Sequence, residues 1–360
     1  MEVSNVLTIA NQDILDLIAK RRDIYIKDPL LIVEHFNNEN KIIDEYNGRQ
    51  LLEMIQNAND ESDTTKPKKV KITLENSTLL IANNGNPFSI GGVESLIYSD
   101  LSPKVMEENK VGQKGLGFRS VLNWSEEIYI ASYDLHLKFS KQHARTFLEG
   151  LIDENPEIQT VLKRKTKKSF SISVLRCPYL EEDTSNKKEK DYDTVVELSL
   201  KDGIGQDIKD QIDKDIIPEI LIFLNKLEEI EVQTDEHHFL LKKEPTDNGI
   251  LITKIDFLDE QNNDSWLWFT SEEKGRLTNN DVTKNYELKI AYNPNTKPSI
   301  QKLFSYFRTD VDFPYPVLAH GSFELSGNRN HLIEDENGFN KMLLDKLAKL
   351  LVDCSIRLTK

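Results

Sequence analysis

The chain has 360 residues, of which 38% are hydrophobic and 30% are charged, and its formal net charge is −15. This composition excludes a disordered or fibrous protein and allows buried cores in two domains. The acidic balance counts against broad nucleic-acid binding, because neutralising phosphates requires a basic surface. The two cysteines lie far apart, which argues against a disulfide framework. There is no run long enough to span a bilayer and no signal-peptide pattern, so we expect a cytoplasmic protein without membrane contact.

The first predicted element that carries chemistry is an amphipathic helix within residues 46–60. At about 100° per residue, its apolar side chains fall on one side: Leu51, Met54, Ile55 and Ala58. Glu53, Asn57 and Asp60 fall together on the opposite side. Between residues 53 and 60 this face carries no Lys or Arg, which a solvated helix would use for ion pairs at four-residue spacing. The pattern fits either a solvated surface helix or a functional site.

Two short strands are predicted next, over residues 70–74 and 79–82. The second strand leads into the sequence NNGNPF, which is a loop pattern. Further along, Gly112, Gly115 and Gly117 stand at the start of an apolar helical segment. Glycines at such a place let the backbone approach a phosphate closely, and the free N–H groups of the following helix can hold the anion.

In this order, the segments YNGRQLLEMIQNAND, NNGNPF and GQKGLGFRSV resemble the GHKL ATPase superfamily, which includes DNA gyrase, the ninety-kilodalton heat-shock chaperone, histidine kinases and MutL. These motifs are most similar to those of the sacsin-type ATPase domains, and the resemblance extends loosely to about His331. It implies an α+β protein with a Bergerat-fold α/β sandwich that binds nucleotide over residues 1–205. A connecting helix and strand over 206–235, an S5-like α+β transducer domain over 236–335 and a C-terminal helix over 336–360 are expected to follow.

The resemblance assigns roles to the polar face of the first helix. Glu53 matches the general base of the hydrolytic members, and a carboxylate can polarise the water that attacks a γ-phosphate. Asn57 matches the Mg²⁺ ligand, and an amide oxygen suits this hard cation. Asp60 matches a residue near the nucleotide sugar, although it is equally compatible with capping the loop that follows the helix.

The base of the nucleotide is expected at the end of the second strand. Asn83 stands where most of the superfamily has an Asp that accepts a hydrogen bond from the adenine amine. Because an amide offers a donor as well as an acceptor, adenine preference is less secure than nucleotide binding. Gly85 would leave room for the base. Thr194 matches a residue that reaches the base, although a β-branched residue is also common in a strand.

The resemblance assigns phosphate binding to the glycine-rich segment, through Gly112, Gln113, Lys114, Gly115, Gly117 and Phe118. Lys114 is equally compatible with an exposed loop position. Residues from about 96 to 111 correspond to the lid that closes over nucleotide in the family, with Gly91 and Gly92 as candidate hinges.

Beyond the first domain, the apolar run 216–224 predicts a helix that bridges the two domains. Short apolar runs follow, separated by turn residues, and predict an antiparallel sheet with packed helices: 239–241, 250–255, 266–269 and 288–292. Arg329 is similar to the arginine with which the chaperone touches the γ-phosphate from outside the nucleotide domain, because a guanidinium suits developing phosphate charge. An ion pair with a nearby acid is the alternative for Arg329, and Arg308 is a second, poorer candidate.

The apolar stripe within residues 339–358 must be covered by the second domain, a partner chain or a further domain. Sacsin-like ATPases often lead larger proteins, so a partner protein or an additional effector domain is expected. By the same resemblance we expect ATP and Mg²⁺ as ligands and homodimerisation coupled to nucleotide binding. Bacterial relatives of this kind have been associated with defence against phage.

Two functions remain open at this point. One is a slow Mg²⁺-dependent ATPase in which nucleotide closes the lid and reorients the domains, and Glu53 favours it. The other is a nucleotide-gated scaffold with negligible turnover, and Asn83 points to it. A histidine kinase is disfavoured because no helix presents a phosphoacceptor His, and a DNA clamp is disfavoured by the net charge.

Overall fold

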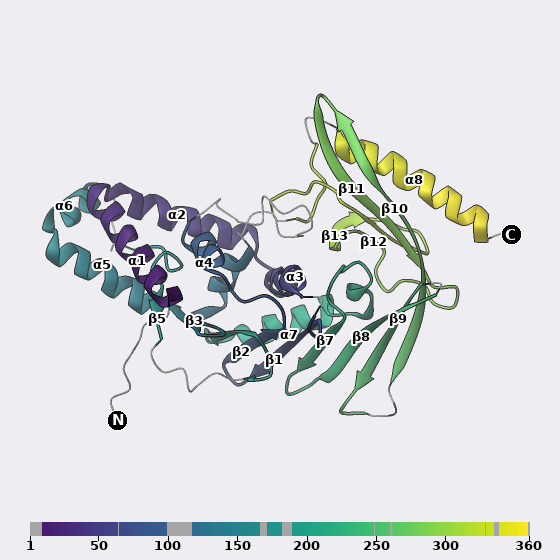
Figure 1. Cartoon of the computed structure of the whole chain (residues 1–360), viewed down its shortest axis with the longest axis horizontal. Coiled ribbons are helices and arrows are strands. Elements are labelled where there is room, and N and C mark those ends of the chain that lie inside the picture. Colours follow the sequence, from purple (N-terminus) through teal and green to yellow (C-terminus); the bar gives the residue numbers. More distant parts are fainter. Residues whose placement is uncertain are drawn as a thin grey trace. The chain divides into compact units, whose positions relative to one another are not determined.

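The computed structural model describes the chain except for residues 1–8, 64, 99–116, 166–170, 182–188, 248, 260, 262, 328, 335–337 and 359–360. It divides into two compact units (Figure 1). The first comprises Met1–Gln211 with Gln233–Asp235, and the second comprises Ile212–Val232 with Glu236–Lys360. The predicted mixture of helices and strands is confirmed. Among the described residues, no helix has the length and apolar character that crossing a membrane requires.

The first unit contains an antiparallel sheet. Its strands follow the order β1 (Lys69–Glu75), β2 (Thr78–Asn83), β6 (Thr194–Leu200), β3 (Ser125–Ser132), β4 (Leu135–Ser140) and β5 (Tyr179–Leu180). The predicted strand pair 70–74 and 79–82 is the β1–β2 hairpin. Its turn places Asn76 at φ 53°, a left-handed conformation that Asn tolerates better than most residues.

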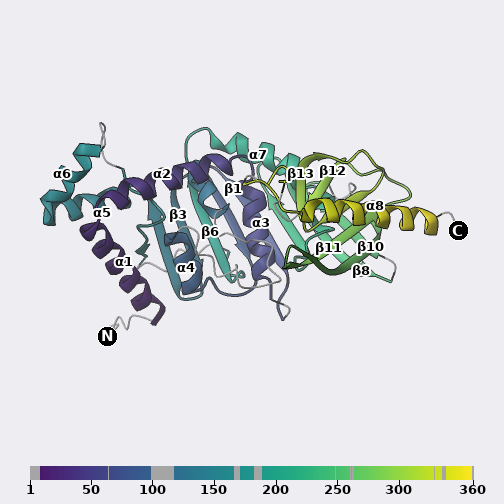
Figure 2. The same ribbon diagram turned by 90° about the horizontal axis from the view of Figure 1, so that it is seen from above.

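Helices cover this sheet and build the rest of the unit. They are α1 (Ile9–Lys27), α2 (Leu30–Glu45), α3 (Gln50–Glu61), α4 (Ile90–Ile97), the 3-10 helix η2 (Gly117–Asn123), α5 (Lys141–Glu154) and α6 (Pro156–Lys165). Figures 1 and 2 both show α3 and α4 over one face of the sheet. A separate apolar cluster joins α1, α2, α5 and α6, with Tyr25, Ile32 and Leu151 at its centre. The helix with the predicted polar face, α3, is therefore packed onto a sheet.

The second unit contains a mostly antiparallel sheet. Its order is β7 (Glu229–Gln233), β8 (His238–Thr246), β9 (Gly249–Asp256), β10 (Asp264–Asn279), β11 (Val282–Tyr292), β14 (Leu318–Gly321), β12 (Lys302–Ser305) and β13 (Phe307–Asp312). The pair β12–β14 is parallel. The four predicted apolar runs lie within β8, β9, β10 and β11. Asn280 and Asp281 join β10 to β11 with φ of 48° and 63°, as a two-residue hairpin turn requires.

The helix α8 (Phe339–Leu358) packs onto the sheet of the second unit. Its apolar stripe joins one cluster with Leu288, Ile290 and Phe323 of that unit, through Phe339, Leu343, Leu347 and Leu350. The predicted stripe is thus covered within the chain from Phe339 to Leu350, and Cys354 packs against the same cluster. Farther along, Val352 and Ile356 are exposed.

The connecting helix lies earlier than the apolar run 216–224 suggested. The α-helix is α7 (Ile204–Asp215), and the run that follows contains only the 3-10 helix η4 (Pro218–Leu221). The reason is Pro218, because the residue before a proline is disfavoured in helical conformation. Ile217 is accordingly extended, with φ −102° and ψ 160°.

Candidate functional site

The polar face of α3 lies inside the protein. All residues from Gln50 to Asp60 are buried except Asn57, which is half-buried. Glu53 is 4% exposed, and Asp60 has no exposed surface. A solvated surface helix is therefore excluded, and the acids and amides of this face lie among protein groups or in a partly enclosed site.

The start of α3 is held by another helix. Its N-cap residue, Arg49, makes no side-chain cap, so the first N–H groups need other acceptors. Gln211 of α7 supplies one, because its Oε1 accepts from Leu51 N at 3.5 Å while its Nε2 donates to Gln50 Oε1 at 3.0 Å. These contacts fix the helix that carries Glu53.

The glycine-rich segment ends against Glu53. A Cβ atom on Gly117 would lie 2.0 Å from Glu53 Oε2, so a side chain at this position would have to displace the carboxylate. Arg49 lies on the other side, with its Nε 4.0 Å from Glu53 Oε1. The face that seemed to lack a basic partner thus has one, one turn before Glu53. The predicted acid and the predicted phosphate-binding segment are brought together.

The NNGNPF segment meets the opposite end of α3. Gly85 has φ 152°, and a Cβ atom there would lie 2.1 Å from the backbone oxygen of Glu61. The N–H of Asn86 donates to the same oxygen at 2.7 Å. The contact with the end of α3 is sufficient by itself to require glycine at position 85, whether or not a nucleotide base also needs the space. The second motif is therefore anchored next to Asp60.

Three polar residues form a row across the sheet. Asn83 of β2 is paired with Thr194 of β6, and Thr194 is paired with Ser132 of β3. The hydroxyls of Thr194 and Ser132 lie 2.8 Å apart, and Phe88 N donates to Ser132 Oγ at 2.9 Å. Thr194 is buried and Asn83 is half-buried. The two predicted base-contacting residues are thus neighbours in the sheet.

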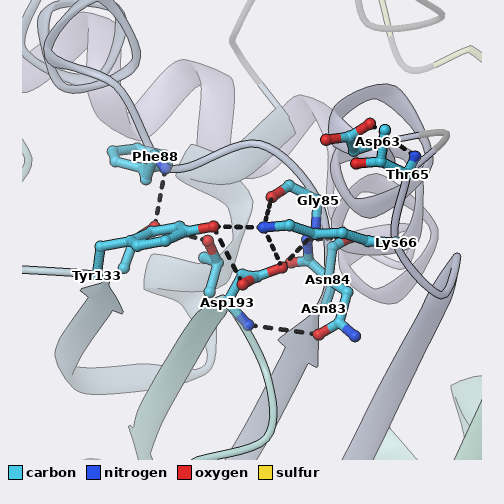
Figure 3. Close-up of polar contacts among 11 residues, drawn as sticks. Asp63, Thr65, Lys66, Asn83, Asn84, Gly85, Phe88, Tyr133 and Asp193 are labelled. Atoms are coloured by element: carbon cyan, nitrogen blue, oxygen red, sulfur yellow. Dashed lines mark hydrogen bonds and ion pairs between the residues drawn. The ribbon is translucent and has the colours of Figure 1, made fainter.

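Sequence reasoning missed an acid at the same end of these strands, Asp193, which directly precedes β6. Asp193 accepts from Gly85 N at 3.0 Å and from Lys66 Nζ at 3.1 Å through Oδ2, and from the Tyr133 hydroxyl at 3.1 Å through Oδ1 (Figure 3). Lys66 also contacts the Tyr133 hydroxyl and the Gly85 carbonyl. No local pattern marks this group, because Lys66 and Asp193 are 127 residues apart.

Asp193 and Lys66 each stabilise the charged form of the other. Burial raises the pKa of Asp193, but the hydrogen bonds from Gly85, Lys66 and Tyr133 outweigh it and leave that pKa below its usual value. The hydrogen bonds to Tyr133 and Asp193 raise the pKa of Lys66. The cluster is therefore an ionised clamp that holds the Gly85 backbone.

Part of the predicted site falls outside the described residues. This applies to Gly112, Gln113, Lys114 and Gly115, and to the expected lid from residue 99 onward. Phe118 is buried within η2. Gly91 and Gly92 lie in the first turn of α4, where Gly92 N donates to the N-cap hydroxyl of Ser89 at 3.1 Å. The two candidate hinges thus belong to a capped helix.

The arginine candidates belong to the second unit, whereas all other described candidates belong to the first. Arg308 binds Asp215, with its Nε and Nη2 each 2.7 Å from Oδ1. This ion pair gives Arg308 a structural role. Arg329 lies in a turn with φ 57°, and its N–H donates to Ser326 O at 2.7 Å. Few non-glycine residues adopt that conformation, so it marks Arg329 as an unusual backbone position.

Comparison with known proteins adds a distant similarity. No protein-family model matches the chain. The chain is 24% identical over 321 residues to Protein NO VEIN of Arabidopsis thaliana, in an alignment that covers 84% of this chain. It spans 11% of the length of that relative.

Proposed function

We propose that the first unit binds a Mg²⁺–nucleoside triphosphate and hydrolyses it slowly. The observation that carries this proposal is the contact between Gly117 and Glu53, since a Cβ on Gly117 would lie 2.0 Å from the carboxylate. A triphosphate held by the backbone of a glycine-rich segment that ends at Gly117 would be presented to this acid. Glu53 would then orient the attacking water and accept its proton.

The remaining residues of the proposed site follow from their places around α3. Asn57 is the one half-buried residue between Gln50 and Asp60, and its amide oxygen is the proposed ligand for the metal ion. Mg²⁺ bound there would neutralise phosphate charge. Asn83 and Thr194 would contact the base, with Asp60 near the sugar. Gly112, Gln113, Lys114 and Gly115 are proposed for the phosphates from the sequence alone.

Nucleotide binding is further proposed to close the lid, rearrange the domains and promote a homodimer, with Arg329 reaching the γ-phosphate. This chain matches 11% of the length of its relative. In line with this, a partner protein or an additional effector domain is part of the proposal. The activity would be chaperone-like, or that of a motor module in a larger system.

One observation favours the alternative of a nucleotide-gated scaffold with negligible turnover. The Arg49 guanidinium lies 4.0 Å from Glu53, and both side chains are buried. An ion pair of this kind competes with a water molecule for the carboxylate oxygen. A scaffold would bind nucleotide through the same residues without using Glu53 as a base.

Turnover and binding measured on the same variants separate the two functions. We expect Glu53→Gln to bind ATP with Mg²⁺ but to lose about 100-fold or more in hydrolysis, the scale of general base catalysis. Glu61→Gln, which changes the last acid of the same helix, is the matched control and should hydrolyse ATP normally. Wild-type protein that binds ATP without turnover would favour the scaffold. Wild-type protein that binds no nucleotide would refute both functions.

A further inference from the structure

Where β2 and β3 end and β6 begins, the sheet carries hydrogen-bonding groups that can each act as donor or acceptor. Asn83, Thr194 and Ser132 lie side by side in the paired strands. Amides and hydroxyls both donate and accept hydrogen bonds, whereas an ionised carboxylate only accepts. The chemistry of a ligand that meets this row depends on which of these groups it reaches.

The carboxylate at this end of the strands, that of Asp193, is already engaged. Asp193 is bound by three donors, namely the Gly85 N–H at 3.0 Å, the Lys66 ammonium at 3.1 Å and the Tyr133 hydroxyl at 3.1 Å. Figure 3 shows these donors grouped around the carboxylate. Using Asp193 as an acceptor for a ligand amine would require disturbing the clamp that holds Gly85.

Asn83 has a weakly held amide. Its Nδ2 is 3.5 Å from Asn84 O, at the limit of a hydrogen bond, and its Oδ1 makes none within the described part of the chain. Rotation of this amide by 180° exchanges its oxygen and nitrogen and gives up only that long contact. Asn83 can therefore present an acceptor or a donor to the same point.

The neighbouring hydroxyl pair has the same property. Ser132 Oγ accepts from Phe88 N, and it shares one hydrogen with Thr194 Oγ1 across 2.8 Å. Whichever of the two donates, one hydroxyl hydrogen and at least one lone pair of the pair are not used by contacts within the described part of the chain, and both residues are buried. The row thus adapts to a donor or an acceptor at two adjacent positions.

We infer that the base end of the site accepts 6-oxopurine nucleotides as well as adenine nucleotides. The inference rests on the proposed function, because it assumes that Asn83 and Thr194 face the base. Adenine presents an amine at position 6 and an acceptor at N1. Hypoxanthine and guanine present a carbonyl oxygen and an N1–H instead, and a fixed carboxylate would repel that oxygen. The substrate class is then purine nucleoside triphosphates.

Inosine triphosphate provides the sharpest probe, since its base has no 2-amino group and differs from that of ATP at the N1–C6 edge. We would measure the affinities of the β,γ-imido analogues of ATP and ITP by calorimetry with Mg²⁺. The wild-type protein should bind the two analogues within about tenfold of each other. Asn83→Asp should keep the ATP analogue and weaken the ITP analogue by at least about tenfold, the lower range for a polar group facing the wrong partner.

Two further variants control for the added charge and for the loss of the amide. Asn86→Asp adds the same charge at an exposed position three residues away and should leave both affinities unchanged. Asn83→Ala removes both the donor and the acceptor, so it should weaken the two analogues to a similar extent. Thermal unfolding of each variant establishes that it is folded at the assay temperature.

Each outcome decides the inference. A wild-type protein that binds the ATP analogue more than about 100-fold tighter than the ITP analogue would overturn it, while leaving nucleotide binding intact. An unchanged ratio in Asn83→Asp would overturn it too, because Asn83 would then not contact the base. Binding of neither analogue would refute the proposed function and this inference with it.

Discussion

Two buried carboxylates of the second unit differ from Glu53 of the first unit in the contacts that hold them. In the second unit, Asp215 meets two nitrogens of Arg308 at 2.7 Å, and Glu219 accepts from the backbone and hydroxyl of Ser299 at 3.0 and 2.6 Å. In the first unit, Glu53 is similarly buried but faces Arg49 at 4.0 Å and the backbone of Gly117. Burial alone does not distinguish a functional acid from a structural one. The short contacts of Asp215 and Glu219 include charge-assisted hydrogen bonds, which are stronger than an ion pair at 4.0 Å such as that of Glu53 with Arg49.

The largest effect should come from filling the space beside Glu53. Gly117→Ala places a methyl group against the carboxylate and must displace it, so we expect a loss of about 100-fold in ATP turnover, the scale of a 1 Å misplacement. Gly150→Ala in α5 is the matched control, because no atom lies within 4 Å of its Cβ position. This control should keep full turnover and stabilise the helix by roughly 0.5–1 kcal/mol. Normal turnover in Gly117→Ala would remove Glu53 from the chemistry.

Removing the ion-pair partner of Asp215 in the second unit should lower the free energy of unfolding. Arg308→Gln leaves Asp215 buried with its charge uncompensated, at a cost of about 3–5 kcal/mol in the free energy of unfolding. Urea unfolding measures this change. Asp312→Asn breaks the exposed ion pair with Lys302 and should cost less than about 1 kcal/mol. Equal costs for the two variants would contradict the distinction between the buried acid and the exposed pair.

A smaller effect should appear in the pH dependence of stability. Burial raises the pKa of Glu39, and this outweighs the opposing hydrogen bonds from Ser173, Val174 and Leu175. Because the folded pKa exceeds the unfolded one, the contribution of Glu39 is complete below its ordinary pKa of 4.5 and is lost as the pH rises through the folded value. As the pH rises from 4.5 through the folded pKa of Glu39, we expect the urea midpoint of the wild type to decline relative to that of Glu39→Gln. A constant difference between the two proteins would contradict the raised pKa.

The smallest effect concerns the clamp of Lys66, Tyr133 and Asp193 beside Gly85. Asp193→Asn removes the charge that binds Lys66, and we expect a loss of about 1 kcal/mol at neutral pH. The pKa of Asp193 is lowered, so its contribution is present above the ordinary value of 3.8 and is lost as the pH falls below it. The two proteins should therefore converge in acid. Asp191→Asn, at an exposed neighbouring position, should match the wild type throughout.

Local patterns were sufficient for several elements of the fold. The apolar spacing of Leu51, Met54, Ile55 and Ala58 predicted α3, and short apolar runs separated by turn residues predicted the β1–β2 hairpin and the strands β8 to β11. The apolar run 216–224 predicted a helix that begins after α7 has ended, and this prediction was wrong. Pro218 is the cause, because it disfavours helical conformation at Ile217.

The site was predictable where its residues are close in sequence. Glu53, Asn57 and Asp60 were found together because they share one helix face. The burial of most of α3 was not predictable, since segments far along the chain contact it, such as Gln211 and Gly117. Asp193 and Lys66 were missed for the same reason, because tertiary structure alone brings them to Gly85. Arg49 was overlooked because it stands one turn before the polar face.

The most direct test of the central claim is a crystal structure with Mg²⁺ and a non-hydrolysable ATP analogue. We predict a metal ion bound by Asn57 and a terminal phosphate beside Glu53 and Gly117. A nucleotide bound elsewhere on the chain, with the polar face of α3 closed by protein side chains, would contradict the account.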